Sequence, residues 1–425
     1  MNKIKIISII LTIVFITFNL SLLASCTGEK VSEKKVSEPL EVRKIAAEEA
    51  DEMADGIDKQ LITANTDFSF KIFNQLAEED AGENIFISPY SISTALAMTY
   101  NGAEGDTKDA MAKTLEFNGI PLDGLNEGFY NLMLGILNAD EDVELNIANS
   151  IWYKEDYDVK EDFLERNREY YRSVVNEIDF SDPGAVDTIN GWISDATKGK
   201  IDKMISNIGP AVVMYLINAI YFKGGWTHEF DEENTEEKDF HGLDSTSKVE
   251  MMYQQNEFGY YEGDSFSAVK LPYGQEKFSM YVILPDEGVG VDSVAQGFDS
   301  SSWDELISSY KNREIKLSMP RFEMEYGIKE LNEALNNLGM GVAFSESADF
   351  SGINPNIFIS RVLHKAVIEV NEKGSEAAAA TVVEAVESAM PAEEIIEFNV
   401  TRPFIFIIAD DRNGSILFMG KAINL

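Results

Sequence analysis

The chain has 425 residues, 44% of them hydrophobic and 11% aromatic, so it is long and apolar enough to bury a large core. It carries 74 acidic against 35 basic residues, a formal net charge of −39. Binding to nucleic acid needs clustered Lys and Arg that displace counterions from phosphates, so this composition excludes a nucleic-acid partner and is typical of a highly soluble protein.

The first residues resemble an export signal. Met1–Lys5 carries two lysines, residues 6–23 form a mostly apolar run, and Leu23-Ala24-Ser25-Cys26 follows. This end resembles the bacterial lipobox, in which the cysteine is lipidated and becomes the first residue. We therefore expect residues 1–25 to be a lipoprotein signal peptide and Cys26 to anchor the exported protein on the outer side of the cell membrane or in the periplasm. An uncleaved signal anchor is the alternative, since the run approaches spanning length.

Residues 26–60 are dense in Glu, Lys, Asp, Ser and Ala and contain no aromatic residue. Such a segment buries too little apolar surface to order itself, so we predict a charged flexible tether, although residues 46–60 are also compatible with a helix. From about residue 61 to residue 425 no further linker or repeat occurs. This continuity favours one large domain over several.

Hydrophobic periodicity and turn residues predict helices at Asp67–Glu79, Ser91–Ala103, Thr107–Leu115 and Lys160–Val175. Strand-like runs are predicted at Val143–Tyr153, Ala211–Phe222, Ala268–Leu271, Phe278–Leu284, Arg313–Met319, Val362–Asn371, Ile395–Asn399, Pro403–Ile408 and Ser415–Gly420. Helices crowd the first half of the chain and strands the second, which indicates an α+β fold.

One stretch, residues 374–389, has conflicting signals. Its alanines and glutamates favour a helix by intrinsic propensity. As a strand, however, it would place Ser375, Ala377, Ala379, Thr381 and Val383 on one face and Glu376 and Glu384 on the other. Small uncharged side chains on one face suit a strand in the middle of a sheet. Loop, helix and buried strand all remain open from the residues alone.

Several motifs occur in a fixed order along the chain: Asn84-Ile85-Phe86-Ile87-Ser88-Pro89-Tyr90-Ser91-Ile92, Asn218-Ala219-Ile220-Tyr221-Phe222-Lys223-Gly224-Gly225-Trp226, Leu317-Ser318-Met319-Pro320-Arg321-Phe322, His364-Lys365-Ala366 with Asn371-Glu372-Lys373-Gly374-Ser375-Glu376-Ala377-Ala378, and Arg402-Pro403-Phe404-Ile405-Phe406 with Phe418-Met419-Gly420-Lys421. Together they resemble the serpin family from about Asp67 to the end of the chain. Each motif alone is weakly specific, and their order makes the resemblance strong.

The resemblance implies a serpin fold of the α+β class over residues 61–425, with three β-sheets, eight or nine helices and an exposed reactive-centre loop at about residues 372–399. It also implies a suicide-substrate inhibitor of serine-type endopeptidases. The target protease cuts the loop and forms a covalent acyl complex, and the upstream half of the loop then inserts into the central sheet as a new strand. Such a protein is not an enzyme and needs no cofactor, and we expect a monomer.

The hinge, residues 372–381, decides whether insertion is allowed. It contains no proline, no charge on the face that would insert and no bulky side chain before Val382. The hinge residues that matter here are Glu372, Gly374, Ser375, Glu376, Ala377, Ala378, Ala379, Ala380 and Thr381. Serpins that do not inhibit commonly depart from this pattern. The hinge therefore favours an inhibitor over the alternative, a non-inhibitory surface binding protein with the same fold.

Counting along the loop as in serpins points to cleavage between Ser388 and Ala389. Glu387 and Met390 are the alternative positions, but Pro391 disfavours cleavage after Met390. No Lys or Arg lies between residues 373 and 402, so a trypsin-like target is excluded. Small residues suit elastase-like or subtilisin-like proteases, whose pockets discriminate by size, and a cut after Glu387 would suit a glutamate-specific one.

By the same resemblance, Ser88, Ser91, Asn218 and His364 form a polar cluster beneath the main sheet, called the shutter. Trp226 marks the breach, where the loop first enters. Since an unperturbed histidine titrates near pH 6.5, we expect a protonation change of His364 within pH 5–8 to alter sheet opening.

An enzyme or metal site finds little support. The chain has only three histidines, His228, His241 and His364, and one cysteine. No G-x-S-x-G elbow lies near any histidine, and none shows the H-E-x-x-H spacing of zinc proteases. We therefore expect no catalytic residues and no metal.

Overall fold

The computed structural model describes residue 37, residues 43–375 and residues 395–425, all within one compact unit, Ser37–Leu425. These residues contain ten α-helices: α1 Ala47–Asp55, α2 Lys59–Glu79, α3 Pro89–Tyr100, α4 Gly105–Thr114, α5 Leu122–Leu137, α6 Glu161–Tyr170, α7 Ala185–Ala196, α8 Val291–Ala295, α9 Ser300–Ser309 and α10 Asn332–Leu335. Three shorter helical turns are η1 Glu232–Asn234, η2 Asn336–Met340 and η3 Gly341–Phe344.

The strands of the described residues are β1 Ile85–Ile87, β2 Val143–Lys154, β3 Val174–Ile178, β4 Met214–Gly225, β5 Glu236–His241, β6 Thr246–Glu262, β7 Phe266–Tyr273, β8 Phe278–Pro285, β9 Lys311–Pro320, β10 Phe322–Glu325, β11 Lys329–Glu330, β12 Leu363–His364, β13 Val367–Val370, β14 Gly374–Ser375, β15 Ile396–Asn399, β16 Phe404–Asp410 and β17 Ile416–Ala422.

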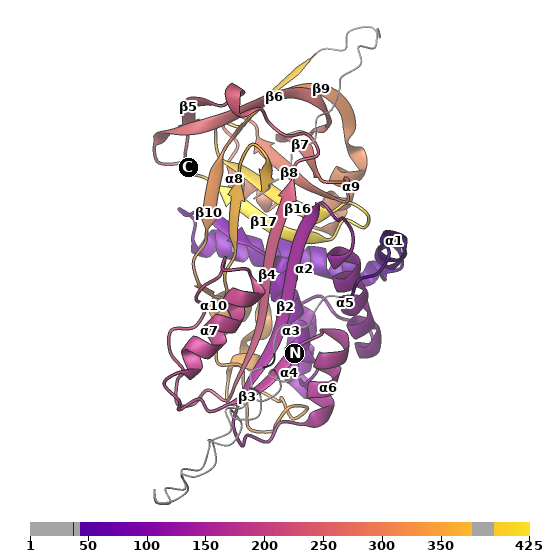
Figure 1. Ribbon diagram of the computed structural model, residues 1–425, viewed down its shortest axis with the longest axis vertical. Helices are drawn as coiled ribbons and strands as arrows, with labels where there is room; N and C mark the ends of the chain where they lie inside the picture. The colour runs from indigo at the N-terminus through magenta and orange to yellow at the C-terminus, as the bar shows by residue number, and fades with distance from the viewer. Residues whose placement is uncertain (1–36, 38–42, 376–394) are drawn as a thin grey trace, which may run out of the picture. The chain divides into compact units, whose positions relative to one another are not determined.

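These strands form a nine-stranded sheet in the order β1-β17-β16-β8-β7-β6-β9-β15, with β5 paired to β6. A second sheet of four strands has the order β14-β4-β2-β3, and β10-β13 and β11-β12 form two short ladders. The long strands β2 and β4 run side by side below the nine-stranded sheet in Figure 1. The predicted α+β class and serpin-type sheet architecture are confirmed, and the described residues contain ten α-helices where eight or nine were predicted.

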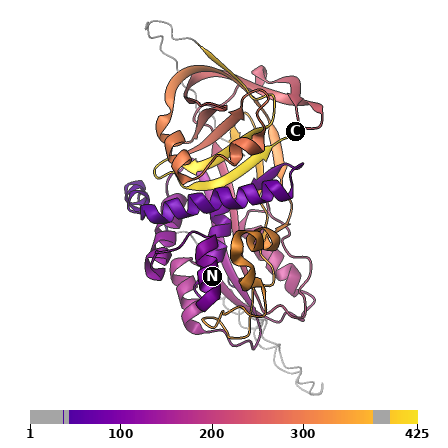
Figure 2. The same cartoon turned by 180° about the vertical axis from the view of Figure 1, so that it is seen from behind.

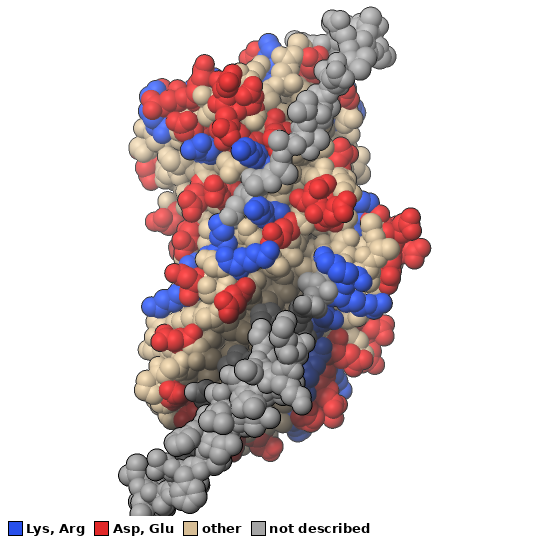
Figure 3. Space-filling view, in the orientation of Figure 1, with Lys and Arg blue, Asp and Glu red and all other residues tan. Residues whose placement is uncertain are grey.

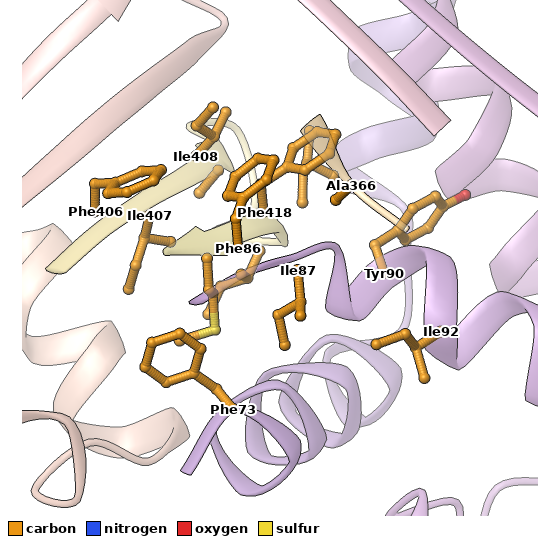
Figure 4. Close-up of a cluster of buried hydrophobic side chains, with 14 of the residues drawn as sticks. Phe73, Phe86, Ile87, Tyr90, Ile92, Ala366, Phe406, Ile407, Ile408 and Phe418 are labelled. Carbon is orange, nitrogen blue, oxygen red and sulfur yellow. The ribbon is translucent and has the colours of Figure 1, made fainter. Parts of the chain in front are cut away.

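The core lies where the nine-stranded sheet meets α2 and α3. Strands β16 and β17 are buried at every position, because both are nearly continuous runs of Phe, Ile, Leu and other apolar residues. The Phe86 ring stacks on Phe406 at 5.7 Å and on Phe418 at 5.6 Å between ring centroids. Phe73 of α2 lies on the other side of this group (Figure 4).

Helix α3 is placed by its first residues. Ser88 is the N-cap, with its side chain accepting from the Ser91 N–H, and Pro89 occupies the first helical position, where its missing N–H is not needed. Seen from behind, α2 crosses the molecule between the nine-stranded sheet and α3 (Figure 2). Helix α3 in turn packs against both β4 and β17, so it contacts both large sheets.

The predicted tether, residues 26–60, is described only at residue 37 and from residue 43 on. Its described end is packed, not free: α1 lies against α5 with Ala50 and Ala54 buried. Arg412 donates to the Ala50 carbonyl at 3.2 Å and to the Gly135 carbonyl of α5 at 3.1 Å. The expectation of a flexible tether is therefore corrected for residues 43–60.

No helix in the described part of the chain combines the length and apolarity that crossing a membrane requires. Within the same residues, no group of His, Cys, Asp and Glu side chains is arranged to hold a metal ion.

Candidate functional site

The chain reverses direction at the start of the predicted hinge. The Asn371 N–H donates to the Gly374 carbonyl at 2.9 Å, and the Gly374 N–H donates back at 3.1 Å. After this turn β14 runs antiparallel to β4, with Gly374 opposite Gly225 and Ser375 opposite Gly224. The hinge therefore enters the four-stranded sheet alongside β4.

Glycine is required at residue 374 by both its backbone and its surroundings. Its φ is +141°, and a Cβ placed there would lie 2.1 Å from the Gly224 carbonyl oxygen. A side chain would thus meet backbone, which cannot move aside as a flexible side chain can. The close pairing of β14 with β4 depends on this residue.

Trp226 holds the hinge from the end of β4. Its backbone N–H donates to the Lys373 carbonyl and its indole N–H to the Asn371 carbonyl, both at 2.9 Å. Its ring stacks on Tyr273 with 4.5 Å between centroids. The residue predicted from the family resemblance to mark the breach therefore contacts the hinge directly.

Three further side chains contact the hinge. The hydroxyls of Tyr273 and Ser375 are hydrogen-bonded at 2.7 Å in a buried position. The Glu372 carboxylate is 5% exposed; it accepts from the Thr235 hydroxyl at 2.7 Å and lies 3.8 Å from Arg321. Buried polar groups need such partners, so the hinge is anchored by its polar atoms as well as by its backbone.

The edge of β4 below Gly224 is the second part of the site. On one side β4 pairs with β2 from Met214 to Gly224. On the other side, among the described strands, only β14 pairs with it, at Gly224 and Gly225. The next strands, β12 and β13, pair with β11 and β10. The described residues thus leave most of this edge of β4 without a neighbouring strand.

The four predicted shutter residues lie together beneath this edge. The Ser88 N–H donates to His364 Nε2 at 3.0 Å, and the Ser91 N–H donates to Ser88 Oγ at 3.2 Å. The Ser91 hydroxyl bonds the Asn218 side-chain oxygen, and Asn218 Nδ2 donates to Asn149 Oδ1 at 2.6 Å. The shutter therefore links α3, β4, β2 and β12 by hydrogen bonds between buried groups.

Burial lowers the pKa of His364 to about 4. Because its Nε2 accepts from Ser88, the neutral ring carries its proton on Nδ1, and protonating Nε2 would break that bond. The expectation that His364 titrates within pH 5–8 is corrected, since desolvation moves its pKa below that range.

A cavity of about 150 Å³ adjoins the shutter. It lies between α3 and the lower half of β4, and its lining includes Ile92, Leu96, Leu216, Asn218 and His364. The space next to the unpaired edge of β4 is therefore not fully packed.

The remaining predicted site residues lie outside the described residues: Cys26, Glu376, Ala377, Ala378, Ala379, Ala380, Thr381, Glu387, Ser388, Ala389 and Met390. Sequence reasoning missed Asn149, which accepts a hydrogen bond from Asn218, and Tyr273, whose hydroxyl is hydrogen-bonded to Ser375. Neither lies in a quoted motif. Their only signal is a polar side chain within an apolar strand.

A protein-family model described as serpin (serine protease inhibitor) matches residues 63–425. Leukocyte elastase inhibitor of Bos taurus is 36% identical and covers 85% of this chain and 99% of its own length. The native-state structure of tengpin, a thermophilic serpin, has a TM-score of 0.80 at 35% identity, covering 87% of this chain and 95% of its own. Human thyroxine-binding globulin in complex with thyroxine has a TM-score of 0.78 at 29% identity, covering 86% and 98%.

Proposed function

Since this chain belongs to the serpin family, we propose that it inhibits a serine-type endopeptidase by offering its reactive-centre loop as a substrate and inserting the cut loop into the four-stranded sheet. The observation that carries this proposal is the antiparallel pairing of Gly374 and Ser375 with β4. The first two residues of an inserting strand already occupy their ladder positions.

Continuing that register down the unpaired edge of β4 gives the expected inserted strand. Ala377 would face Phe222, Ala379 would face Ile220 and Thr381 would face Asn218 of the shutter. Opposed residues in an antiparallel pair share a face, so these small side chains would lie over the core as Ser375 does.

Insertion supplies the free energy for trapping the protease. About ten new ladder hydrogen bonds at roughly 1 kcal/mol each, plus buried side chains, give a scale of ~10 kcal/mol. The uncut fold is accordingly a kinetic trap, held by a barrier and not by being the most stable state. The fast movement of the acyl-linked protease would distort its active site before water can release it.

The target is expected to accept small residues. Cleavage at Ser388–Ala389 suits an elastase-like or subtilisin-like protease, and a relative at 36% identity is named leukocyte elastase inhibitor. Thyroxine-binding globulin, which shares the fold, is named for binding a small molecule. A non-inhibitory binding role is therefore the alternative, and the experiment must distinguish it from protease inhibition.

To test this function, the protein lacking residues 1–25 is mixed separately with pancreatic elastase, with subtilisin and with a glutamyl endopeptidase. We expect an SDS-stable adduct with at least one protease, and a large rise in heat resistance once the loop is cut. If all three proteases cleave the loop, no adduct forms and the cleaved protein is no more heat-resistant than the intact one, the inhibitory function is refuted and the binding role is favoured.

We also propose that the mature protein is exported and anchored by lipid on Cys26. The supporting pattern is the apolar run before Leu23-Ala24-Ser25-Cys26. Expression of the full chain in a bacterium should place it in the membrane fraction, and Cys26→Ser should release it or leave it unprocessed. Mass spectrometry of the N-terminus distinguishes lipidation from an uncleaved anchor.

A further inference from the structure

A surface hollow lies where the chain leaves the reactive-centre loop. It has a volume of about 580 Å³ and lies between the end of β6, the end of α9 and the start of β9. Its lining includes Tyr260, Tyr261, Tyr310, Lys311, Arg313 and Ile396. Ile396 begins β15, which pairs in parallel with β9 at the edge of the nine-stranded sheet. The hollow is thus continuous with the segment that carries the loop.

The aromatic walls of the hollow are fixed in place. Tyr310 lies 6.3 Å from Tyr261 and 5.6 Å from Tyr281 between ring centroids, and Tyr260 packs edge-on against Phe398 at 6.5 Å. Rigid tyrosines provide large contact area at low loss of conformational entropy, which is why they are enriched where protein interfaces are strongest. The hollow is therefore prepared for contact before any partner arrives.

The charge of the hollow differs from that of the chain. Lys311 and Arg313 lie on the same face of β9, while the chain as a whole carries a net charge of −39. Carboxylates spread over much of the face shown in Figure 3, and Lys and Arg are gathered at few places. Glu262 also lines the hollow, so the lining carries two cationic side chains and one carboxylate. This favours a partner that presents a carboxylate beside an apolar side chain.

The hollow is within reach of a protease bound at the loop. Ile396 follows Ser388 by eight residues, a fully extended span of at most about 28 Å. A protease domain of ~200 residues has a radius of gyration of about 16 Å, so its body extends some 20 Å from the scissile bond. A protease attacking Ser388 is therefore large enough for its surface to reach the hollow.

We propose that this hollow is an exosite: it binds a surface segment of the target protease that carries a carboxylate next to an aromatic or aliphatic side chain. The exosite rests on the inhibitory function proposed above and adds to it a determinant of target choice outside the loop. Its contribution is to the rate of association, because cations near the loop steer a carboxylate-bearing partner and the tyrosines hold it.

The test compares Lys311→Glu combined with Arg313→Glu against a matched control, Lys113→Glu combined with Arg166→Glu on α4 and α6, at the other end of the structure from β9 (Figure 1). The readout is the second-order rate of loop cleavage by whichever of elastase, subtilisin and glutamyl endopeptidase is fastest. A free peptide of residues 384–395 serves as reference. For the Lys311/Arg313 variant we expect the cleavage rate to fall at least tenfold at low salt and by less at 0.5 M salt. The rate for the control variant should stay within twofold of the parent, and the rate for the free peptide should change less than twofold between the two salt concentrations.

Tyr261→Ala should lower the same rate at both salt concentrations, because its contribution is contact area and not charge. Equal cleavage rates for the parent and the Lys311/Arg313 variant would overturn the exosite. Cleavage rate is measured whether or not an adduct forms, so absence of the adduct refutes inhibition alone, and an unchanged rate refutes the exosite alone.

Discussion

The nine-stranded and four-stranded sheets are built on opposite principles. In the first, β16 and β17 are buried at every position and each lies between two paired neighbours. In the second, β4 has a described neighbour along only two residues of one edge, and buried polar side chains of α3, β2 and β4, those of Ser91, Asn149 and Asn218, are hydrogen-bonded beside that edge. Apolar interdigitation fixes one arrangement, whereas hydrogen-bonded groups beside an unpaired edge can exchange partners.

On the proposed function, the nine-stranded sheet supplies stability and the four-stranded sheet undergoes the conformational change. Four substitutions test this division between the two sheets.

The first places a charge on the face that would insert. Thr381→Arg would put a guanidinium opposite Asn218 with no acidic partner in the shutter, and an uncompensated buried charge costs about 3–5 kcal/mol. We expect the variant to be cleaved as a substrate with the adduct lost. Glu384→Arg changes the opposite face of the same strand and is the control. An adduct of normal yield from Thr381→Arg would contradict the proposed register.

The second removes apolar packing from the nine-stranded sheet. Phe86→Ala deletes a ring stacked on Phe406 and Phe418, and we expect a loss of about 3–5 kcal/mol in the free energy of unfolding. Urea denaturation followed by tryptophan fluorescence measures it. The adduct yield of the folded fraction should not change. A fall in adduct yield at unchanged urea stability would reverse the roles given to the sheets.

The third uses pH. The pKa of His364 is about 4 in the folded protein and ordinarily 6.5, so the histidine stabilises the fold fully above pH 6.5 and progressively less as pH falls toward 4. The lost stability is about 3 kcal/mol at most, at 1.36 kcal/mol per pKa unit. We expect His364→Gln to flatten the pH dependence of urea stability between pH 6.5 and 4. Identical profiles for parent and variant would show that another group carries this dependence.

The fourth tests the close approach at the hinge. Gly374→Ala should destabilise the uncut state by about 1–3 kcal/mol, because its φ is +141° and its Cβ would meet the Gly224 carbonyl. Gly288→Ala is the control, having a φ of +86° with no atom within 4 Å of its Cβ. If Gly374→Ala lowers the thermal midpoint more than Gly288→Ala does, the difference measures the steric contact with the Gly224 carbonyl. Equal decreases would mean that backbone strain alone accounts for the effect and that the contact contributes nothing.

The sequence predicted the nine-stranded sheet unevenly. β8, β16 and β17 are predominantly apolar and were placed within a few residues, whereas β6, a 17-residue strand, was missed. Its exposed face carries Lys, Glu and Gln, and its apolar residues do not alternate regularly. Its place in the sheet is set by pairing with β9 and β7, which local periodicity does not reveal.

Helix α5 was missed for a different reason. Its glycines lower helix propensity, but a Cβ at Gly128 would lie 2.3 Å from the Leu61 side chain. Gly135 similarly faces Ala50 of α1. These glycines are close-packing contacts to distant residues, and a single sequence shows only their local cost.

The motifs of the family resemblance contain residues that the structure brings together. Ser88, Ser91, Asn218 and His364 lie in one hydrogen-bonded group and Trp226 contacts the hinge, while their roles in sheet opening and loop entry stay predictions. The low pKa of His364 was not predicted, because it follows from complete burial, which residue identity alone does not give. The packing of α1 was missed because its main polar contact, Arg412, lies more than 350 residues away in the chain.

The Arg412 contact has a mechanical consequence. Arg412 pairs with Asp410 at 2.6 Å and with Asp51 of α1 at 3.2 Å, and Lys277 also holds Asp51 at 2.7 Å. Asp410 ends β16 and Lys277 directly precedes β8, so both belong to the nine-stranded sheet. A pull on α1 would therefore be transmitted to β16 and β8 through these ion pairs. The loop insertion proposed above takes place in the other, four-stranded sheet, to which these ion pairs do not belong.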